Sequence, residues 1–342
     1  MDPLDALNET AFLLERELAP GFKVKAFRRA AAVVGEWTPE ELAARASDGR
    51  LKATKGIGSR TFEIITQALA GRVPDYLADL RERTATTLPA EVAELHGKLR
   101  GDLHAHSDWS DGTTDIPSMV AAARLLGHRY LALTDHSPSL TVANGLSPER
   151  LEEELDVVAE LNGSDATGPD FTLLAGIEVD ILEDGSLDQE KALLDRLDVV
   201  VASVHSKLRA DSATMTKRML AAIDDPHTDV LGHCTGRLVE GSRGTRPPSD
   251  FDAVAVFAAC AANGVAVEIN SRPERQDPPD DLIRLAVDSG CLFSIDSDAH
   301  APGHLSFLDL GAARAVALEV PAERIVTTWE LPQLLEWTSR RG

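Results

Sequence analysis

The sequence predicts an α/β protein in which a parallel sheet closes into a barrel, preceded by a small all-α domain. Two observations predict it. From residue 99 onward, short β-rich runs alternate with helical runs, whereas the first 80 or so residues contain helical runs only. Strands that alternate with helices are typical of a parallel sheet covered by helices. With 342 residues, the chain is long enough for one large catalytic domain and a small accessory one.

Helical segments fill the first domain. Residues 4–18 and 22–37 form two helical runs, the first of them amphipathic. A third helix is predicted to begin at Pro39, with Thr38 as its cap. Two shorter segments flank KGIGSR at residues 55–60. This domain is therefore expected to be all-α and to cover residues 1–80.

A linker and seven strand–helix units follow. Residues 81–98 contain Thr and Pro, which weaken any periodic apolar pattern there. This predicts a linker with one short helix, followed by a second domain over residues 99–342. The predicted strands cover residues 99–106, 129–136, 171–181, 197–205, 229–233, 265–270 and 291–300. The predicted helices between them cover residues 116–127, 151–162, 215–225, 251–264 and 279–290. Seven units in about 240 residues favour a closed barrel over an open sheet. No good candidate for an eighth strand is present.

Composition and charge exclude several classes of protein. No apolar run is long enough to cross a membrane, and the N-terminus does not have the pattern of a secretion signal. The three cysteines lie far apart, as expected of buried thiols in a reducing cytoplasm. The net charge of −22 is uneven, because residues 1–80 carry 11 basic and 12 acidic residues and the remainder carries 23 and 44. An acidic surface gives no steering toward DNA, although bound cations would offset it locally.

Metal-ligating side chains lie at or just after the C-terminal ends of the predicted strands. In a parallel barrel these ends face the same mouth, so residues scattered over 200 positions are expected to converge. The C-terminal end of the predicted strand at residues 265–270 is expected at the same mouth. The candidate ligands are His104, His106, Asp111, His136, Glu178, His205, His233, Asp298 and His300.

These residue types indicate a hydrolytic metal centre. Alternate residues of a strand face the same side, so His104 and His106 can share one ion. Imidazole and carboxylate suit Zn²⁺, Mn²⁺ or Fe²⁺. Nine ligands exceed the needs of one ion, so we expect two to three divalent ions, with a carboxylate such as Glu178 as a bridge. Such centres hydrolyse phosphate esters. Of the other four histidines (His96, His128, His227 and His304), only His304 is kept as a possible substrate contact.

A phosphate substrate also needs cationic or N–H donors. Several cations follow strand ends, namely Lys207, Arg209, Arg237, Arg272 and Arg275. We favour Arg237 among them, and place it with Asp298 and His300 in the catalytic step. A solvated loop charge is an equally good interpretation of each of the others.

The motifs GDLHAHSDWSDG, LTDHSP, GIEVDI, ASVHS, LGHCTGR, EIN and SDAH resemble those of the polymerase-and-histidinol-phosphatase (PHP) domain. In order and spacing they are most similar to the C-terminal PHP domain of bacterial family X DNA polymerases, over residues 99–342. The resemblance implies a distorted (β/α)7 barrel with three metal ions. By position, one ion would take His104, His106, Glu178 and Asp298, a second Glu178, His205 and His233, and a third Asp111, His136 and His300.

The first domain resembles the small lyase-type helical domain that begins family X polymerases. KVKAFRRAA and LKATKGIGSRTFEII are similar to its second helix and its helix-hairpin-helix motif. The resemblance implies that Gly56, Gly58 and Arg60 contact DNA, because such a hairpin exposes backbone N–H groups to a phosphate. Ile64 stands where the family has its Schiff-base lysine, and no polymerase palm or fingers intervene. We therefore expect neither lyase nor nucleotidyl-transfer activity.

Three functions remain open at this point. The first is a DNA-end-processing hydrolase, a 3′–5′ exonuclease or a 3′-phosphodiesterase or phosphatase, which the hairpin favours. The second is a small-molecule phosphatase of the histidinol-phosphatase type, which the acidic barrel favours because a small phosphate ester needs no basic track. The third is a DNA-bound scaffold with structural metals. Salt dependence separates the first two, because binding through several phosphates weakens steeply as salt rises.

Overall fold

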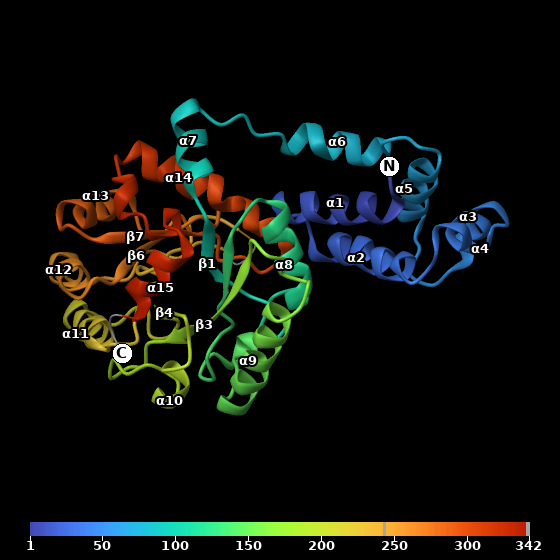
Figure 1. Cartoon of the computed structure of the whole chain (residues 1–342). Helices are drawn as coiled ribbons and strands as arrows, with labels where there is room; N and C mark the ends of the chain where they lie inside the picture. The colour runs from blue at the N-terminus through green and yellow to red at the C-terminus, as the bar shows by residue number, and fades with distance from the viewer. Residues whose placement is uncertain (242–243, 340–342) are drawn as a thin grey trace. The chain divides into compact units, whose positions relative to one another are not determined.

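The protein divides into two compact units, Met1–Thr87 and Leu88–Gly342. A computed structural model describes residues 1–241 and 244–339 (Figure 1). Each unit has a hydrophobic core of its own. Because apolar burial is the main stabilising term in folding, each unit carries its own source of stability.

The first unit is all-helical. Its helices are α1 (Pro3–Arg16), α2 (Gly21–Gly35), α3 (Pro39–Ser47), α4 (Arg50–Ala53), α5 (Ser59–Leu69) and α6 (Asp75–Thr84). Helix α1 contacts α2, α5 and α6, and Figure 1 shows α6, α1 and α2 side by side. Leu7 and Leu14 of α1 and Ile64 and Ile65 of α5 are buried in the core that these helices share. The N-terminal helical region expected from the sequence is thus present.

The start of α3 follows the expected pattern. Thr38 is the N-cap, and its Oγ1 accepts a hydrogen bond from the backbone N–H of Glu41 at 3.2 Å. Pro39 occupies the first helical position, where the missing N–H of proline costs nothing. Helices α4 and α5 are joined by a turn in which the N–H of Ile57 donates to the carbonyl of Thr54 at 3.1 Å.

Seven parallel strands form the sheet of the second unit, in the order β1-β2-β3-β4-β5-β6-β7. They are β1 (Gly101–Ala105), β2 (Tyr130–Leu133), β3 (Thr172–Asp180), β4 (Val199–Ser203), β5 (Val230–Leu231), β6 (Ala266–Asn270) and β7 (Leu292–Asp296). Each predicted strand region therefore contains one observed strand. The nearly closed barrel of parallel strands confirms the predicted fold class.

Helices surround this barrel (Figure 1). They are α7 (Ala90–Lys98), α8 (Ile116–Leu125), α9 (Pro148–Asn162), α10 (Lys191–Leu194), α11 (Ser212–Asp224), α12 (Ala253–Asn263), α13 (Asp280–Asp288), α14 (Leu308–Ala317) and α15 (Leu331–Ser339). The 3₁₀ segments are η1 (Thr141–Ala143), η2 (Pro302–Phe307), η3 (Ala322–Arg324) and η4 (Val326–Thr328). No element was assigned from the sequence after residue 300, where the chain forms η2, α14, η3, η4 and α15.

The boundary between the units falls within the segment expected to be a linker. Helix α6 ends at Thr84 inside the first unit, and α7 belongs to the second. Val92 and Leu95 of α7 are both 6% exposed and join the core around the barrel. Residues three apart lie on one face of a helix, so this pair gives α7 an apolar face that packs into this core, beside α14.

Side chains and one additional segment close the seam between β7 and β1. At the C-terminal end of the strands, the N–H of His106 donates to the carbonyl of Ala299 at 2.7 Å. Lower down, the N–H of Leu103 donates to Asp296 Oδ1 at 2.9 Å, and that of Ser297 to Asp102 Oδ1 at 3.2 Å. Buried carboxylates thus accept backbone N–H groups that a full ladder would otherwise pair.

Thr327 in η4 fills the other end of the seam. Its carbonyl accepts from the N–H of Arg100 at 2.7 Å, and its Oγ1 accepts from the N–H of Ile295 at 3.2 Å. The carbonyl of Thr327 also accepts from the buried hydroxyl of Tyr130 at 3.2 Å. A short 3₁₀ segment therefore takes part of the place that an eighth strand would have, in agreement with the lack of a good eighth strand in the sequence.

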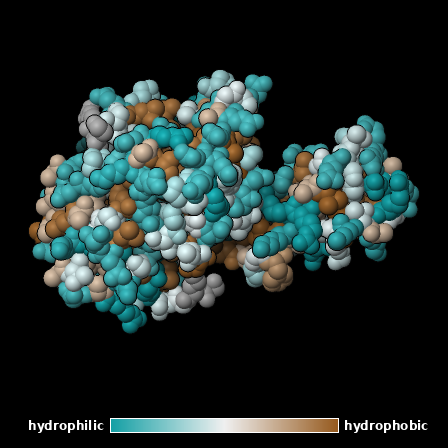
Figure 2. Space-filling view, turned by 90° about the horizontal axis from the view of Figure 1, so that it is seen from below, coloured by the Kyte–Doolittle hydropathy of each residue, from teal (hydrophilic) through white to brown (hydrophobic). Residues whose placement is uncertain are grey.

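The face drawn in Figure 2 is mainly hydrophilic, with hydrophobic residues in separate small groups. Among the residues that the structure describes, no helix combines the length and apolar character needed to span a bilayer.

Candidate metal centre

The C-terminal ends of the strands bring the candidate ligands together. His104 lies in β1 and Glu178 in β3, while His136, His205 and His233 follow β2, β4 and β5. All neighbouring strands are parallel, so these ends lie at one mouth of the barrel. Chemistry at this mouth is the general rule for barrels of parallel strands.

Glu178 stands at the centre of the group. Its Oε1 lies 2.8 Å from His233 Nε2 and 3.3 Å from His205 Nε2. Its Oε2 lies 2.9 Å from His136 Nδ1 and 3.3 Å from His104 Nε2. The two oxygens of one buried carboxylate therefore face different imidazoles, as a bridging ligand between two ions would.

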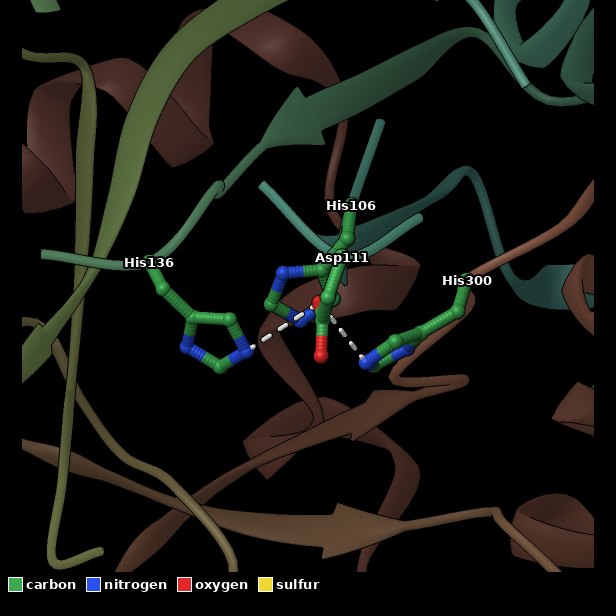
Figure 3. A group of neighbouring side chains, drawn as sticks. All are labelled: His106, Asp111, His136 and His300. Atoms are coloured by element: carbon green, nitrogen blue, oxygen red, sulfur yellow. Dashed lines mark ion pairs between the residues drawn. The ribbon is translucent and has the colours of Figure 1, made fainter. Parts of the chain in front are cut away.

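A second group lies closer to solvent and contains His106, Asp111, His136 and His300 (Figure 3). Figure 3 shows the imidazoles of His136 and His300 on either side of Asp111. Asp111 Oδ1 lies 3.4 Å from His136 Nε2 and 3.3 Å from His300 Nε2. The Asp111 side chain is 37% exposed and that of His300 is 18% exposed. This is consequently the side of the group that is open to solvent.

Asp298 is held in a fixed orientation. Its backbone has φ of +51°, a left-handed conformation that costs energy for a residue other than glycine. Arg275 Nε donates to Asp298 Oδ2 at 2.9 Å, and Asn270 Nδ2 donates to the same oxygen at 3.1 Å. Oδ1 remains for the centre and lies 3.6 Å from His106 Nε2. Asp298 is thus oriented to offer one oxygen to an ion.

The buried polar atoms of this cluster fit divalent metal ions. The close contacts between these imidazoles and Glu178 do not have hydrogen-bond geometry. Both ring nitrogens of His106, His205 and His233, one nitrogen each of His104 and His136, and Glu178 Oε1 are therefore buried without a hydrogen bond. Buried polar atoms normally have partners, and leaving one without costs about 1–3 kcal/mol. The described residues form three overlapping groups whose ligand atoms lie within 4.8 Å of one another: His106/Asp111/His136/His300, His104/His106/Glu178 and His136/Glu178/His205.

Burial and neighbouring charges shift the pKa values of the imidazoles in opposite directions. Burial opposes protonation of His136, but the carboxylates of Glu178 and Asp111 outweigh it and raise its pKa to about 10. Burial lowers the pKa of His106 to about 3, and the neighbouring His300 and His136 add to that effect. Burial would raise the pKa of Glu178, but the surrounding histidines hold it well below its usual range. Protons compete with metal at such a centre, so metal binding releases protons and strengthens as pH rises.

The favoured phosphate-binding residue, Arg237, is engaged elsewhere. Its Nε donates to the carbonyl of Arg275 at 3.2 Å, and its Nη2 donates to the carbonyl of Gln276. Arg272 lies closer to the ligands, because its Nη1 is 2.9 Å from His300 Nδ1. Lys207 is 66% exposed, and its Nζ lies 3.9 Å from Glu183. Both Lys207 and Arg209 are exposed.

His304 lies beside the centre. Its Nδ1 accepts a hydrogen bond from the backbone N–H of His300 at 3.2 Å, and its ring stacks on Phe307 with centroids 5.0 Å apart. Burial, with Arg272 and His300 nearby, holds the pKa of His304 well below its usual range. A neutral ring can accept this hydrogen bond, so His304 orients the backbone of His300.

Sequence reasoning missed two acidic residues that contact the candidate ligands. Asp180 Oδ1 accepts the backbone N–H of His205 at 3.1 Å and lies 3.4 Å from its Nδ1. Glu268 lies 2.6 Å from His104 Nδ1 and is fully buried. Both acidic residues interrupt otherwise apolar strands, two positions from another inward polar residue. That pattern is a signal that could have found them.

The residues expected to contact DNA lie on the α4–α5 hairpin of the first unit. Gly56 has φ of +99°, and Gly58 is the N-cap of α5. Arg60 is 60% exposed; its Nη1 lies 2.9 Å from Glu63, and its guanidinium lies 5.1 Å from the centre of the Tyr76 ring. Lys52 and Lys55 are exposed on the same hairpin. Ile64, at the position of the family's lysine, is 1% exposed.

The PHP domain family model matches residues 102–272, half of the chain. This chain belongs to the PHP domain family. Proteins of this family are phosphoesterases that use divalent metal ions, and the predicted enzyme class, a metal-dependent hydrolase of phosphate esters, is confirmed. The matched segment contains seven of the nine candidate ligands, and Asp298 and His300 lie beyond it.

Two curated relatives have different lengths. The DNA polymerase/3′-5′ exonuclease PolX of Bacillus subtilis is 36% identical over 225 residues, which are 66% of this chain and 38% of PolX. The chain therefore spans well under half the length of that relative. The probable phosphatase YcdX of Escherichia coli is 28% identical over 258 residues, which are 73% of this chain and 94% of YcdX.

Among solved structures, the chain is similar to histidinol phosphate phosphatase from Lactococcus lactis, whose crystal structure contains zinc, L-histidinol and phosphate. The identity is 18%, the TM-score is 0.43, and the match covers 64% of this chain and 92% of that one.

Proposed function

We propose that this PHP phosphoesterase acts on DNA ends, as a 3′–5′ exonuclease or a 3′-phosphodiesterase or phosphatase. The observation that carries the proposal is one chain with both a histidine-rich metal centre and an exposed helical hairpin that resembles a DNA-binding motif. The similarity to PolX, whose name includes 3′–5′ exonuclease, supports it. The proposal requires both features to serve the same substrate.

The hairpin has the features of a phosphate-binding turn. Gly56 has a positive φ, and Gly58 is exposed with open space at its Cβ position. The N–H groups of Ile57 and Gly58 donate within the turn, to the carbonyl of Thr54 and to Thr61 Oγ1, so a phosphate would be held by the N–H groups that open α5, which have no partner within the helix. Three cations (Lys52, Lys55 and Arg60) lie on it, exposed. Main-chain N–H groups and cations are the usual contacts to DNA phosphates, and they hold DNA without reading its sequence. A hydrolase of DNA ends needs this kind of sequence-independent contact.

We propose that the nine candidate ligands hold two to three divalent ions, Zn²⁺, Mn²⁺ or Fe²⁺. When bound, such ions supply the Lewis acidity that phosphate-ester hydrolysis needs. Among the protein's own groups, Glu178 would hold two ions through its two oxygens, and Asp298 would offer one oriented oxygen. His300 and Asp111 form the solvent-facing side at which the phosphate enters. Arg272 is the cation best placed to contact it there, because it lies beside His300 and its side chain is 10% exposed.

A small-molecule phosphatase of the histidinol-phosphatase type is the second candidate. The observation that favours it is charge, because the chain beyond residue 80 carries 44 acidic and 23 basic residues. Such a surface repels polyanions but leaves a small monoester largely unaffected. The match to YcdX, named a probable phosphatase, spans nearly all of that relative and points in the same direction.

The test is to incubate Mn²⁺-loaded protein with 3′-recessed, 3′-phosphorylated and single-stranded oligonucleotides, and in parallel with histidinol phosphate. His104→Ala removes a candidate ligand, and His96→Ala on α7 is the matched histidine control. We expect processing of DNA 3′ ends that His104→Ala abolishes and His96→Ala retains. Turnover of histidinol phosphate alone would contradict the DNA proposal and support the second candidate.

A further inference from the structure

Of the seven strands of the barrel, all within the described residues, β6 alone supplies none of the nine candidate ligands at its end. Its sequence, Ala-Val-Glu-Ile-Asn, nevertheless places a fully buried carboxylate and a fully buried amide inside the barrel. Val267 and Ile269 belong to the core between barrel and helices, whereas Ala266 belongs to the cluster inside the barrel. Because side chains alternate along a strand, Glu268 and Asn270 also point inward.

Glu268 contacts two ligand residues from different strands. Its Oε1 lies 2.6 Å from His104 Nδ1, and its Oε2 accepts the backbone N–H of His233. Asn270 Nδ2 donates to the same Oε2 at 3.3 Å and to Asp298 Oδ2 at 3.1 Å. One strand thus touches ligand residues carried by β1 and by the segments that follow β5 and β7.

We propose that Glu268 and Asn270 are positioning residues, which hold His104, His233 and Asp298 in the geometry that binds metal. A carboxylate accepts hydrogen bonds, so the proton of His104 is placed on Nδ1. The lone pair of Nε2 then faces Glu178 Oε2, at 3.3 Å. Partners of this kind set the tautomer and the ring orientation of metal-binding histidines, and their loss costs about 10- to 100-fold in metal affinity.

Replacement by glutamine shows why both oxygens of Glu268 are needed. All three contacts of this side chain are with N–H donors, two of them at Oε2. A glutamine has one carbonyl oxygen, which accepts, and one NH₂ group, which only donates. The N–H groups on one side, either that of His104 or those of His233 and Asn270, would then face the NH₂ group. Glu268→Gln must therefore lose either the contact to His104 or those to His233 and Asn270. Glu268→Asp keeps the charge but is too short to reach both sides.

The inference rests on the proposed metal centre, and its test measures metal rather than turnover. The zinc affinity of the full chain is determined by competition with a chromophoric chelator, and zinc per chain by equilibrium dialysis. We expect Glu268→Gln and Glu268→Asp each to weaken zinc binding by about 10- to 100-fold. Glu183→Gln, an exposed carboxylate beyond the end of β3, is the matched control and should equal the parent. Because Glu268→Asp keeps the negative charge, weaker zinc binding by this variant cannot be caused by the loss of charge.

A spectroscopic readout identifies the cause. Long-range ¹H–¹⁵N spectra of the zinc-loaded parent should show His104 as the Nδ1–H tautomer, and Glu268→Gln should change that signal. If Glu268→Gln does not fold, as judged by circular dichroism, Asn270→Ala takes its place and should weaken zinc binding by a smaller factor. Zinc affinities of the folded variants within twofold of the parent would overturn the inference. A parent that binds neither Zn²⁺ nor Mn²⁺ would instead overturn the proposed function.

Discussion

At the scale of single residues, the pKa of a buried carboxylate in the second unit is set by the charges next to it. Glu178 and Asp298 face histidines and arginines, which hold the pKa of each well below its usual range despite burial. Glu154 on α9 is equally buried but lies beside another carboxylate, Asp135. Burial and Asp135 together raise the pKa of Glu154 well above its usual range. Both effects favour the protonated form of Glu154 in the folded protein.

Glu154→Gln should stabilise the protein increasingly as pH rises. The folded parent keeps a proton that the unfolded chain releases above its ordinary pKa, so the free energy of unfolding of the parent falls with pH in that range. Glutamine has the size of a protonated glutamate and does not titrate. We expect the difference between variant and parent to grow by up to about 1.4 kcal/mol per pH unit. Urea unfolding between pH 5 and pH 8 measures it.

Glu153→Gln, an exposed neighbour on the same helix, is the control and should show no such trend. A difference between Glu154→Gln and its parent that stays constant from pH 5 to pH 8 would mean that Glu154 is ionised in the folded protein.

At the scale of elements, the loop after β1 shows how the barrel holds a solvent-facing ligand. Asp135 Oδ1 accepts the backbone N–H of Ser107 at 2.9 Å, and its carboxylate also accepts the hydroxyls of Ser107 and Ser110. Arg150 of α9 donates to the carbonyls of Trp109 and Asn144. These contacts anchor the residues that lead into Asp111, and after it the N–H groups of Gly112 and Thr113 donate to the carbonyls of Ser107 and His300, both at 2.8 Å. The partly exposed carboxylate is thus held from both sides.

The α4–α5 hairpin allows a prediction that separates folding from binding. Gly56→Ala places a Cβ at φ of +99°, 3.2 Å from Val33 Cγ2 and 3.3 Å from Arg29 Cγ. We expect it to destabilise the first unit by about 1–2 kcal/mol. Gly58→Ala meets open space at φ of −93° and should cost less than Gly56→Ala, at most about 1 kcal/mol, because alanine is a poorer N-cap than glycine. Hydrogen exchange of the amides in residues 1–87 measures both effects.

Gly58→Ala should nevertheless lower the rate of DNA-end hydrolysis, because a methyl group there blocks close approach of a phosphate to the backbone. Gly97→Ala on α7, also open at Cβ, is the matched control. Hydrolysis of a small phosphate ester should be unchanged in both variants. Unaltered DNA hydrolysis by Gly58→Ala would remove the hairpin from the proposed substrate path.

At the scale of the whole molecule, two compact units of opposite character share one chain. The first has nearly balanced charge and exposed cations on its hairpin, whereas the second is strongly acidic. A substrate with many phosphates would therefore be held mainly by the first unit and a small ester by the centre alone.

Salt should consequently separate the two proposed substrates. If Lys52, Lys55 and Arg60 contact about three phosphates, DNA-end hydrolysis should lose about 40-fold in kcat/KM between 50 and 200 mM salt. Hydrolysis of histidinol phosphate should change little, because only one phosphate is bound. The measurement is kcat/KM for both substrates across a salt series with Mn²⁺ held constant. Equal salt dependence would mean that the hairpin does not hold the DNA substrate.

The sequence by itself determined the strand–helix alternation, the seven-stranded barrel and the nine side chains that converge at one mouth. These follow from local properties, since strand period, residue type and position at a strand end can be read within a few residues. Only the tertiary structure decided which oxygen of Glu178 faces which histidine, that Arg237 is bound to backbone carbonyls, and that Glu268 lies beside His104. It also decided that Thr327 closes the seam. Each depends on contacts between residues far apart in the chain, which a local pattern does not contain.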